Sequence, residues 1–155
     1  MVYLPVFKDH PISFIAKESL FKTPITGQWI KVLGNVPISR FADRAAAEAI
    51  INGIKRYKTG SPMGIFPEGK RSYGNDLIDF KAGAFKLAIK PKANILIGVL
   101  YDVYTVSKKP FYKRKKVYVH FLEVLQYEDY KDMKSQDLSE HVKSLIQEQQ
   151  VQLQE

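Results

Sequence analysis

The sequence predicts an α/β domain whose central sheet is mixed but largely parallel. Three observations carry this prediction: short apolar runs bounded by glycine, proline or charge, helical repeats between those runs, and the resulting order of strand, helix, strand, helix, strand. With 155 residues, 45% of them hydrophobic, the chain is long enough for one domain with its own core. We therefore expect a single domain over residues 1–155, with its site in the loops that follow the strands.

The first half of the chain holds three predicted strands and one predicted helix. The strands are the short apolar runs at residues 14–16, 36–39 and 63–66. The helix covers residues 43–58, because alanine and isoleucine recur at helical spacing, cations occupy the last turn, and Gly60 follows as a stop. A helix between two buried strands is typical of a parallel crossover.

The second half begins with another helix and ends its sheet with a hairpin. Residues 80–89 have one apolar face and are followed by Pro91, which predicts a helix ending there. Residues 94–100 form the next apolar strand. Residues 101–106 and 116–125 also have strand character and are separated by a strongly basic loop, so we expect a hairpin.

The two ends of the chain differ in character. Asp137 followed by Glu140 resembles a capping box, and the apolar spacing over residues 138–146 predicts a final amphipathic helix. Residues 2–7 are nearly all apolar, with no polar residue or cap before them. Two explanations stay open: a docked N-terminal strand or helix, or a Met1 that is an internal methionine of a longer protein.

Composition excludes several kinds of site. The chain has no cysteine and three scattered histidines, so disulfides, thiolate zinc sites and cysteine nucleophiles are excluded, and we expect no metal and no cofactor. No apolar run reaches the roughly 18 residues that cross a bilayer, and no signal peptide is recognisable. The net charge of +8 attracts anions, which include nucleic acid, anionic lipid headgroups and phosphate- or CoA-bearing substrates.

The most informative segment is residues 66–72, Phe-Pro-Glu-Gly-Lys-Arg-Ser, directly after a predicted strand. Arg71 offers a planar, permanently charged fork for phosphate, Gly69 lets backbone approach a ligand, and Ser72 adds a hydroxyl donor. Glu68 could orient Arg71 through a charge-assisted hydrogen bond. The alternative is an ordinary polar turn, since these residue types are common in loops.

This segment resembles the Phe-Pro-Glu-Gly-Thr-Arg-Ser motif of the lysophosphatidic acid acyltransferases, with Lys70 in place of threonine. Other blocks agree in order and spacing: FIAKESLF at residues 14–21, GNVPISR at 34–40 and FKAGAF at 80–85. The resemblance covers about residues 10 to 125 and implies a glycerol-3-phosphate acyltransferase-like fold. The substrate-binding residues that it implies are Lys17, Arg40, Phe66, Pro67, Glu68, Gly69, Arg71 and Ser72.

The resemblance implies transfer of a fatty acyl group from acyl-CoA or acyl carrier protein to 1-acylglycerol 3-phosphate, giving phosphatidic acid. In that family a histidine is the general base and an aspartate five residues later orients it. Arg40 is then a candidate contact of the glycerol phosphate, and we expect it to converge with Arg71 on one phosphate. For Lys17 an exposed surface position is the competing interpretation.

The catalytic His-x-x-x-x-Asp motif is absent from these 155 residues. Isoleucine or leucine stands five residues after each of His10, His120 and His141, and His10 is only a weak candidate for the base. We expect the chain to begin after the catalytic segment of a longer enzyme. The alternative is a phosphate- or lipid-binding protein that has lost catalysis. Residues 95–99 also depart from the family, which has a Val-Pro step there.

A basic loop near the second hairpin strand suggests contact with a membrane. Its members are Lys108, Lys109, Phe111, Tyr112, Lys113, Arg114, Lys115 and Lys116. Cations mixed with aromatic residues suit anionic headgroups, which predicts peripheral binding at the cytoplasmic face of a membrane. A solvated hairpin tip that blocks edge pairing is the alternative. Nucleic-acid binding is a competing class, but no recognised motif supports it, and we expect no nucleic-acid partner.

Overall fold

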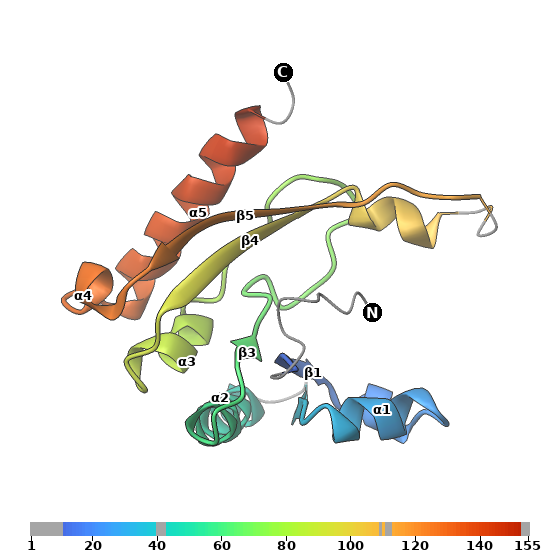
Figure 1. Cartoon of the computed structure of the whole chain (residues 1–155), viewed down its shortest axis with the longest axis horizontal. Coiled ribbons are helices and arrows are strands. Elements are labelled where there is room, and N and C mark those ends of the chain that lie inside the picture. Colours follow the sequence, from blue (N-terminus) through green and yellow to red (C-terminus); the bar gives the residue numbers. More distant parts are fainter. Residues whose placement is uncertain (1–10, 40–42, 109, 111–112, 153–155) are drawn as a thin grey trace. The chain divides into compact units, whose positions relative to one another are not determined.

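The computed structural model describes residues 11–39, 43–108, 110 and 113–152, and the chain divides into two compact units, Met1–Ile65 and Phe66–Glu155. The chain has a mixed α/β fold, as the sequence predicts, with a parallel three-stranded sheet in the first unit. Each unit has its own strands and helices (Figure 1). Among the described residues, no helix combines the length and apolarity needed to cross a membrane.

The first unit is built on a parallel sheet in the order β2-β1-β3. Its strands are β1 (Ser13–Lys17), β2 (Val36–Ile38) and β3 (Met63–Gly64), so all three predicted strands of this half are confirmed. The register pairs Ile15 with Val36 and Ser13 with Met63. The carboxyl ends of the strands therefore share one edge of the sheet.

Helix α2 (Asp43–Lys58) connects β2 to β3 and has the predicted bounds. Ala49 and Gly53 are buried, and three cations lie in the last turn, where they favour the negative end of the helix dipole. Gly60, at φ +88°, ends the segment in the left-handed region that glycine adopts without strain.

Two short helical elements between β1 and β2 are not predicted by the sequence. They are the 3₁₀ helix η2 (Glu18–Lys22) and helix α1 (Thr26–Val32). Helix α1 packs closely on η2, because a Cβ atom at the buried Gly27 would lie 2.6 Å from the carbonyl oxygen of Phe21. A helix of seven residues without a side-chain cap at its start has too few sequence signals to be recognised.

The second unit contains an antiparallel ribbon of β4 (Ile95–Tyr101) and β5 (Tyr118–Leu125). These strands confirm the predictions at residues 94–100 and 116–125. The strand predicted at residues 101–106 is wrong: Asp102 adopts φ +62° and the 3₁₀ helix η4 (Val103–Ser107) follows. The β-branched residues of this segment favour a strand, but the turn at Asp102 ends β4 first.

The second unit has helices both before and after the ribbon in the sequence. The helix predicted at residues 80–89 is present as η3 (Ala82–Phe85) continued by α3 (Lys86–Ile89). The short α4 (Tyr127–Tyr130) has a capping box that the sequence analysis missed. The final helix, α5 (Ser135–Gln152), is confirmed but starts earlier than predicted. Asp137 lies in its first turn, where its side chain accepts a hydrogen bond from the Lys134 amide just before the helix.

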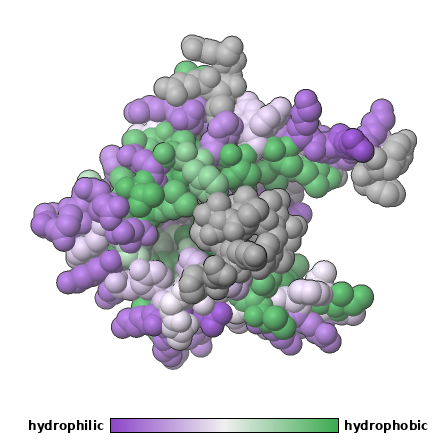
Figure 2. Space-filling model, viewed as in Figure 1, coloured by the Kyte–Doolittle hydropathy of each residue, from purple (hydrophilic) through white to green (hydrophobic). Residues whose placement is uncertain are grey.

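The ribbon buries one face and exposes the other. Helix α5 lies next to the ribbon in Figure 1, and buried side chains of both supply most of this unit's core. These are Ile97, Val99, Leu125, Leu138, Val142 and Ile146, with Ala84, Phe85, Leu87 and Tyr130 beside them. The opposite face, which includes Leu96, Leu100, Phe121 and Val124, is partly exposed, and Figure 2 shows hydrophobic surface over this ribbon.

Candidate functional site: the Glu-Gly-Lys-Arg loop

The loop of residues 66–76 follows β3 directly and is held by backbone hydrogen bonds at its base. The Gly69 amide donates to the Phe66 carbonyl at 3.1 Å, and the Lys81 amide donates to the Pro67 carbonyl at 2.8 Å. Gly69 has φ +64°, so the turn suits glycine. The Lys81 side chain lies over this turn, since a Cβ at Gly69 would be 3.2 Å from its Cε atom.

The charged side chains of the loop are arranged differently from the sequence expectation. Lys70 and Arg71 are exposed, whereas one carboxylate oxygen of Glu68, Oε2, is buried. Within the described part of the chain, Oε2 has no hydrogen-bond partner, and no ion pair joins Glu68 to Arg71. Burying a carboxylate oxygen without a hydrogen bond costs free energy. Glu68 Oε2 can therefore accept a hydrogen bond from a ligand.

The Ser72 hydroxyl bonds within its own loop. Its Oγ atom contacts the carbonyl oxygens of Gly74 at 2.8 Å and Asp76 at 3.1 Å, and it accepts from the Gly74 amide at 3.3 Å. The hydroxyl has one proton to donate, and both acceptors within its reach are carbonyl oxygens of the loop. These bonds within residues 72–76 shape the loop.

Asn75 attaches the loop to two distant elements, and the sequence analysis gave it no role. Its side-chain Nδ2 donates to Asp102 Oδ1 at 3.0 Å, and its Oδ1 accepts from the Asp102 amide at 2.9 Å. Its backbone carbonyl accepts from Gln150 Nε2 at 2.9 Å. The partners lie 27 and 75 positions away. No local sequence signal could have identified this contact, because only folding brings these residues together.

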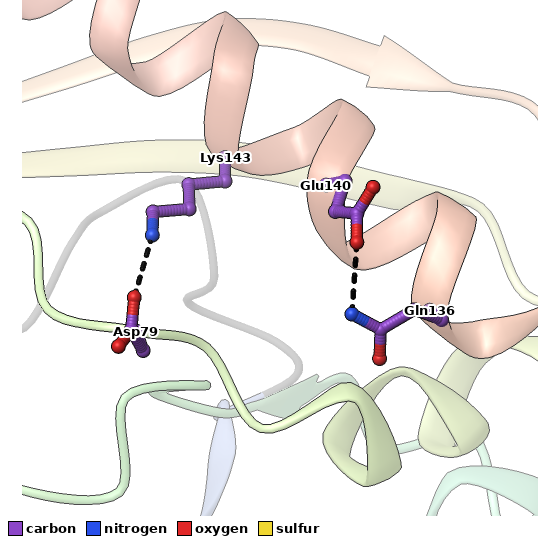
Figure 3. A network of polar contacts seen from close by, with 4 residues as sticks. All are labelled: Asp79, Gln136, Glu140 and Lys143. Atoms are coloured by element: carbon purple, nitrogen blue, oxygen red, sulfur yellow. Dashed lines mark hydrogen bonds and ion pairs between the residues drawn. The ribbon is translucent and has the colours of Figure 1, made fainter.

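An ion pair attaches the segment after the loop to helix α5. Lys143 Nζ lies 2.8 Å from Asp79 Oδ1 (Figure 3). In the preceding part of the same helix, Gln136 donates to Glu140 at 2.9 Å. The hydrogen bond and the charge of Lys143 lower the pKa of the Asp79 carboxyl below its ordinary value. Lys70 adds a smaller contribution in the same direction.

The other predicted site residues lie elsewhere along the chain. Lys17 is the exposed last residue of β1 and stands opposite Ile38 in the parallel register. Arg40 and His10 lie outside the described residues, so the convergence of Arg40 with Arg71 remains a prediction. The loop thus holds six of the eight residues that the resemblance implied for binding: Phe66, Pro67, Glu68, Gly69, Arg71 and Ser72.

The described part of the basic loop presents its charge to solvent. Lys113, Arg114 and Lys116 are exposed and Lys115 is half-buried. Lys108 lies over the ring of Tyr104, with its Nζ atom 4.4 Å from the ring centroid. Three members of the predicted membrane contact, Lys109, Phe111 and Tyr112, lie outside the described residues.

Comparison with known proteins decides the family. The model of the family described as Acyltransferase matches residues 1–107, which is more than half of the chain. This chain belongs to the acyltransferase family. The resemblance inferred from the Glu-Gly-Lys-Arg loop is thereby confirmed.

Several curated relatives share the family with this chain. The 1-acyl-sn-glycerol-3-phosphate acyltransferase of Borreliella burgdorferi is 32% identical over 144 residues, covering 90% of this chain and 55% of the relative. That of Escherichia coli is 30% identical over 142 residues, covering 89% and 57%. A chloroplastic acyltransferase of the same activity, LPAT1 of Arabidopsis thaliana, is 36% identical over 89 residues, covering 57% and 25%.

A solved structure agrees with the fold. The LPA acyltransferase PlsC from Thermotoga maritima superimposes with a TM-score of 0.73 at 23% identity, over 92% of this chain and 56% of that chain. The chain thus spans about half the length of the bacterial relatives that it matches. The predicted fold class is confirmed by this likeness together with the parallel sheet.

Proposed function

We propose that this chain acts in phospholipid synthesis, transferring a fatty acyl group from acyl-CoA or acyl carrier protein to 1-acylglycerol 3-phosphate and giving phosphatidic acid. The observation that carries the proposal is the loop of residues 66–72. It presents two exposed cations next to a buried carboxylate oxygen that has no hydrogen-bond partner among the described residues. The names of the bacterial relatives support the same reaction.

The loop residues suit an acceptor that has both a phosphate and a hydroxyl. Arg71 can bind two phosphate oxygens through its planar fork, and Lys70 adds a second positive charge. Glu68 Oε2 can accept a hydrogen bond from a glycerol hydroxyl, which would satisfy the buried oxygen. Arg40 is proposed as a further phosphate contact, and Lys17 as a further binding residue from the parallel sheet.

The transfer itself needs a base. The acceptor hydroxyl attacks the thioester carbonyl as a base removes its proton, and the thiolate then leaves as the new ester forms. No histidine of this sequence has an aspartate five residues later. That observation favours a second candidate function: a family member that binds phosphate or lipid without transferring an acyl group.

Binding and turnover measured together separate the two candidates. Calorimetry with a short-chain lysophosphatidate, kept below its micelle concentration, should give saturable binding, and Arg71→Ala should weaken it about 10- to 150-fold, as expected for lost hydrogen bonds to a charged group. Arg114→Ala is the matched control, because it removes an exposed arginine outside residues 66–72. Thiol release from acyl-CoA reports turnover.

Each outcome decides something. Binding with thiol release supports the acyltransferase, and binding without thiol release supports the non-catalytic candidate. Absent binding, or equal binding by Arg71→Ala and the native chain, contradicts both.

We further propose that the partner surface is an anionic membrane, approached at its cytoplasmic face by the basic loop, residues 108–116. The acceptor and the product are both lipids, so a peripheral enzyme must reach the bilayer to exchange them. Exposed cations at Lys113, Arg114 and Lys116 support this proposal, since each cation near an anionic surface contributes about 1 kcal/mol.

A further inference from the structure

Helix α1 and the residue directly before it expose large apolar side chains that the proposed function does not use. Ile25, Trp29 and Val32 are 73%, 63% and 79% exposed. Trp29 and Val32 are three positions apart in α1 and so lie on one side of the helix, and Ile25 is the residue directly before its start. Figure 2 shows hydrophobic surface at the lower right, the position of α1 in Figure 1. We call Ile25, Trp29 and Val32 the α1 row.

The α1 row cannot turn inward without breaking local contacts. The opposite side of α1 carries the buried Gly27, where a Cβ would lie only 2.6 Å from the Phe21 carbonyl oxygen. The helix start is held as well, because the Gly27 amide donates to the Thr23 carbonyl at 3.0 Å and the hydroxyls of Thr23 and Thr26 lie 2.6 Å apart. The fold therefore keeps these side chains outward.

The exposure of three large apolar side chains at one short helix indicates a binding surface. Such clustered groups mark binding surfaces more often than scattered ones do. Tryptophan has an apolar ring and a polar N–H, which together suit the boundary between headgroups and acyl chains.

The charges around the row favour an anionic partner. Residues 17–33 contain three lysines and one glutamate. Lys31 is exposed on the same helix. The glutamate, Glu18, pairs with Lys22 at 3.3 Å on the surface, where an ion pair contributes little to stability. Apolar and aromatic groups flanked by lysines are the pattern of helices that lie in a membrane interface.

We propose that α1 lies in the interface of a bilayer containing anionic phospholipid, with the α1 row at the boundary between headgroups and acyl chains. This contact belongs to the first unit, whereas the basic loop belongs to the second. The choice of a membrane as the partner of α1 rests on the proposed function. Its own observations are the exposure, spacing and fixed orientation of the row.

Trp29 is the only tryptophan of the chain, so its intrinsic fluorescence reports on α1 without a label. With vesicles of phosphatidylcholine mixed with phosphatidylglycerol, we expect the emission to shift to the blue and to be quenched by phospholipid brominated near the headgroup. Vesicles of phosphatidylcholine alone should give a weaker response.

Substitution of the row tests the energetics. The Ile25→Ser, Val32→Ser double variant should bind the mixed vesicles at least about tenfold more weakly, because both lost side chains contribute apolar area. Ile51→Ser is the matched control: Ile51 is 53% exposed, lies on α2 outside the row, and its replacement should leave vesicle binding unchanged. The single Val32→Ser variant should show a smaller loss in the same direction.

Three results would overturn the proposal: vesicle binding with unchanged Trp29 emission, equal binding by the double variant and the native chain, or a blue shift without vesicles that grows with protein concentration, which would indicate a second copy as the partner. Failure of the proposed function is distinguishable. Binding of the short-chain acceptor does not need vesicles, and the double variant should retain it, which also shows that this variant is folded.

Discussion

The guanidinium group of Arg56 occupies the space that a side chain at Gly34 would need. A Cβ at Gly34 would lie 2.5 Å from the Nε atom, and Gly34 has φ +70°. Arg56 is held there by a bond to the hydroxyl of Ser13, which is fully buried and donates to the Leu33 carbonyl at 2.8 Å. Three residues from β1, α2 and the turn before β2 thus depend on a glycine.

Gly34→Ala should therefore lower the free energy of unfolding by about 2–3 kcal/mol, combining left-handed strain with displacement of Arg56. Urea denaturation measures this. Gly60→Ala is the control, since Gly60 has φ +88° but no atom within 4 Å of a Cβ there, so only the conformational part, about 1 kcal/mol, should be lost. Equal losses in both variants would show that Arg56 yields freely.

Asp79 offers a residue-level test of the contact with α5. Its hydrogen bond from Lys143 lowers the pKa of the carboxyl in the folded chain. A lowered folded pKa stabilises the fold above the ordinary aspartate pKa, and this contribution is lost as pH falls through the folded value.

In Lys143→Met the pKa of Asp79 should rise, which an NMR titration of the carboxyl carbon measures. Lys131→Met, which removes a different surface pair with Glu128, should leave the pKa of Asp79 unchanged. If the midpoint of Asp79 is the same in Lys143→Met and the native chain, the ion pair does not persist in solution.

At the scale of elements, the Glu-Gly-Lys-Arg loop depends on its connection to η4 and α5. The Asn75 amide group makes two hydrogen bonds with Asp102, the residue whose left-handed conformation ends β4. The same asparagine accepts from Gln150 near the end of α5. The side chain and the backbone carbonyl of Asn75 therefore position the loop relative to the start of η4 and to α5.

Asn75→Ala should lower the free energy of unfolding by about 1–3 kcal/mol, because it removes two hydrogen bonds and leaves the Asp102 groups unpaired. Amide hydrogen exchange over residues 70–80 should become faster. Gln150→Ala removes a single bond and should have a smaller effect. Unaltered exchange in Asn75→Ala would show that the loop keeps its shape without Asp102.

At the scale of the whole molecule, the net charge of +8 is concentrated where the proposed membrane contacts lie. Six of the 24 cations fall within residues 108–116. A field of this kind attracts anionic surfaces over about 10 Å at moderate salt and loses its effect as salt rises.

Neutralising Lys113, Arg114, Lys115 and Lys116 to glutamine should weaken sedimentation with phosphatidylglycerol-containing vesicles at least about tenfold, since each cation contributes about 1 kcal/mol near the surface. Added salt should weaken the native chain in the same way. Replacing four cations outside the loop, Lys55, Lys58, Lys86 and Lys90, is the control for net charge. Equal losses in both sets would assign the binding to overall charge and remove the loop's special role.

Much of the fold and the central part of the site could be predicted from the sequence, because their signals are local. Helix α2 follows from apolar spacing within 16 residues, and the strands of the parallel sheet follow from short apolar runs. The loop of residues 66–72 is a contiguous motif, so it identified the family without coordinates.

Only the tertiary structure decided the features that join distant residues. Residues 101–106 have strand propensity, yet they turn at Asp102, which bonds to a side chain 27 positions earlier. The apolar α1 row faces outward because Gly27 packs against Phe21, and the carboxylate oxygen of Glu68 is buried away from Arg71. Short-range periodicity determines which elements form, whereas packing between elements determines which side chains are buried, paired or left exposed.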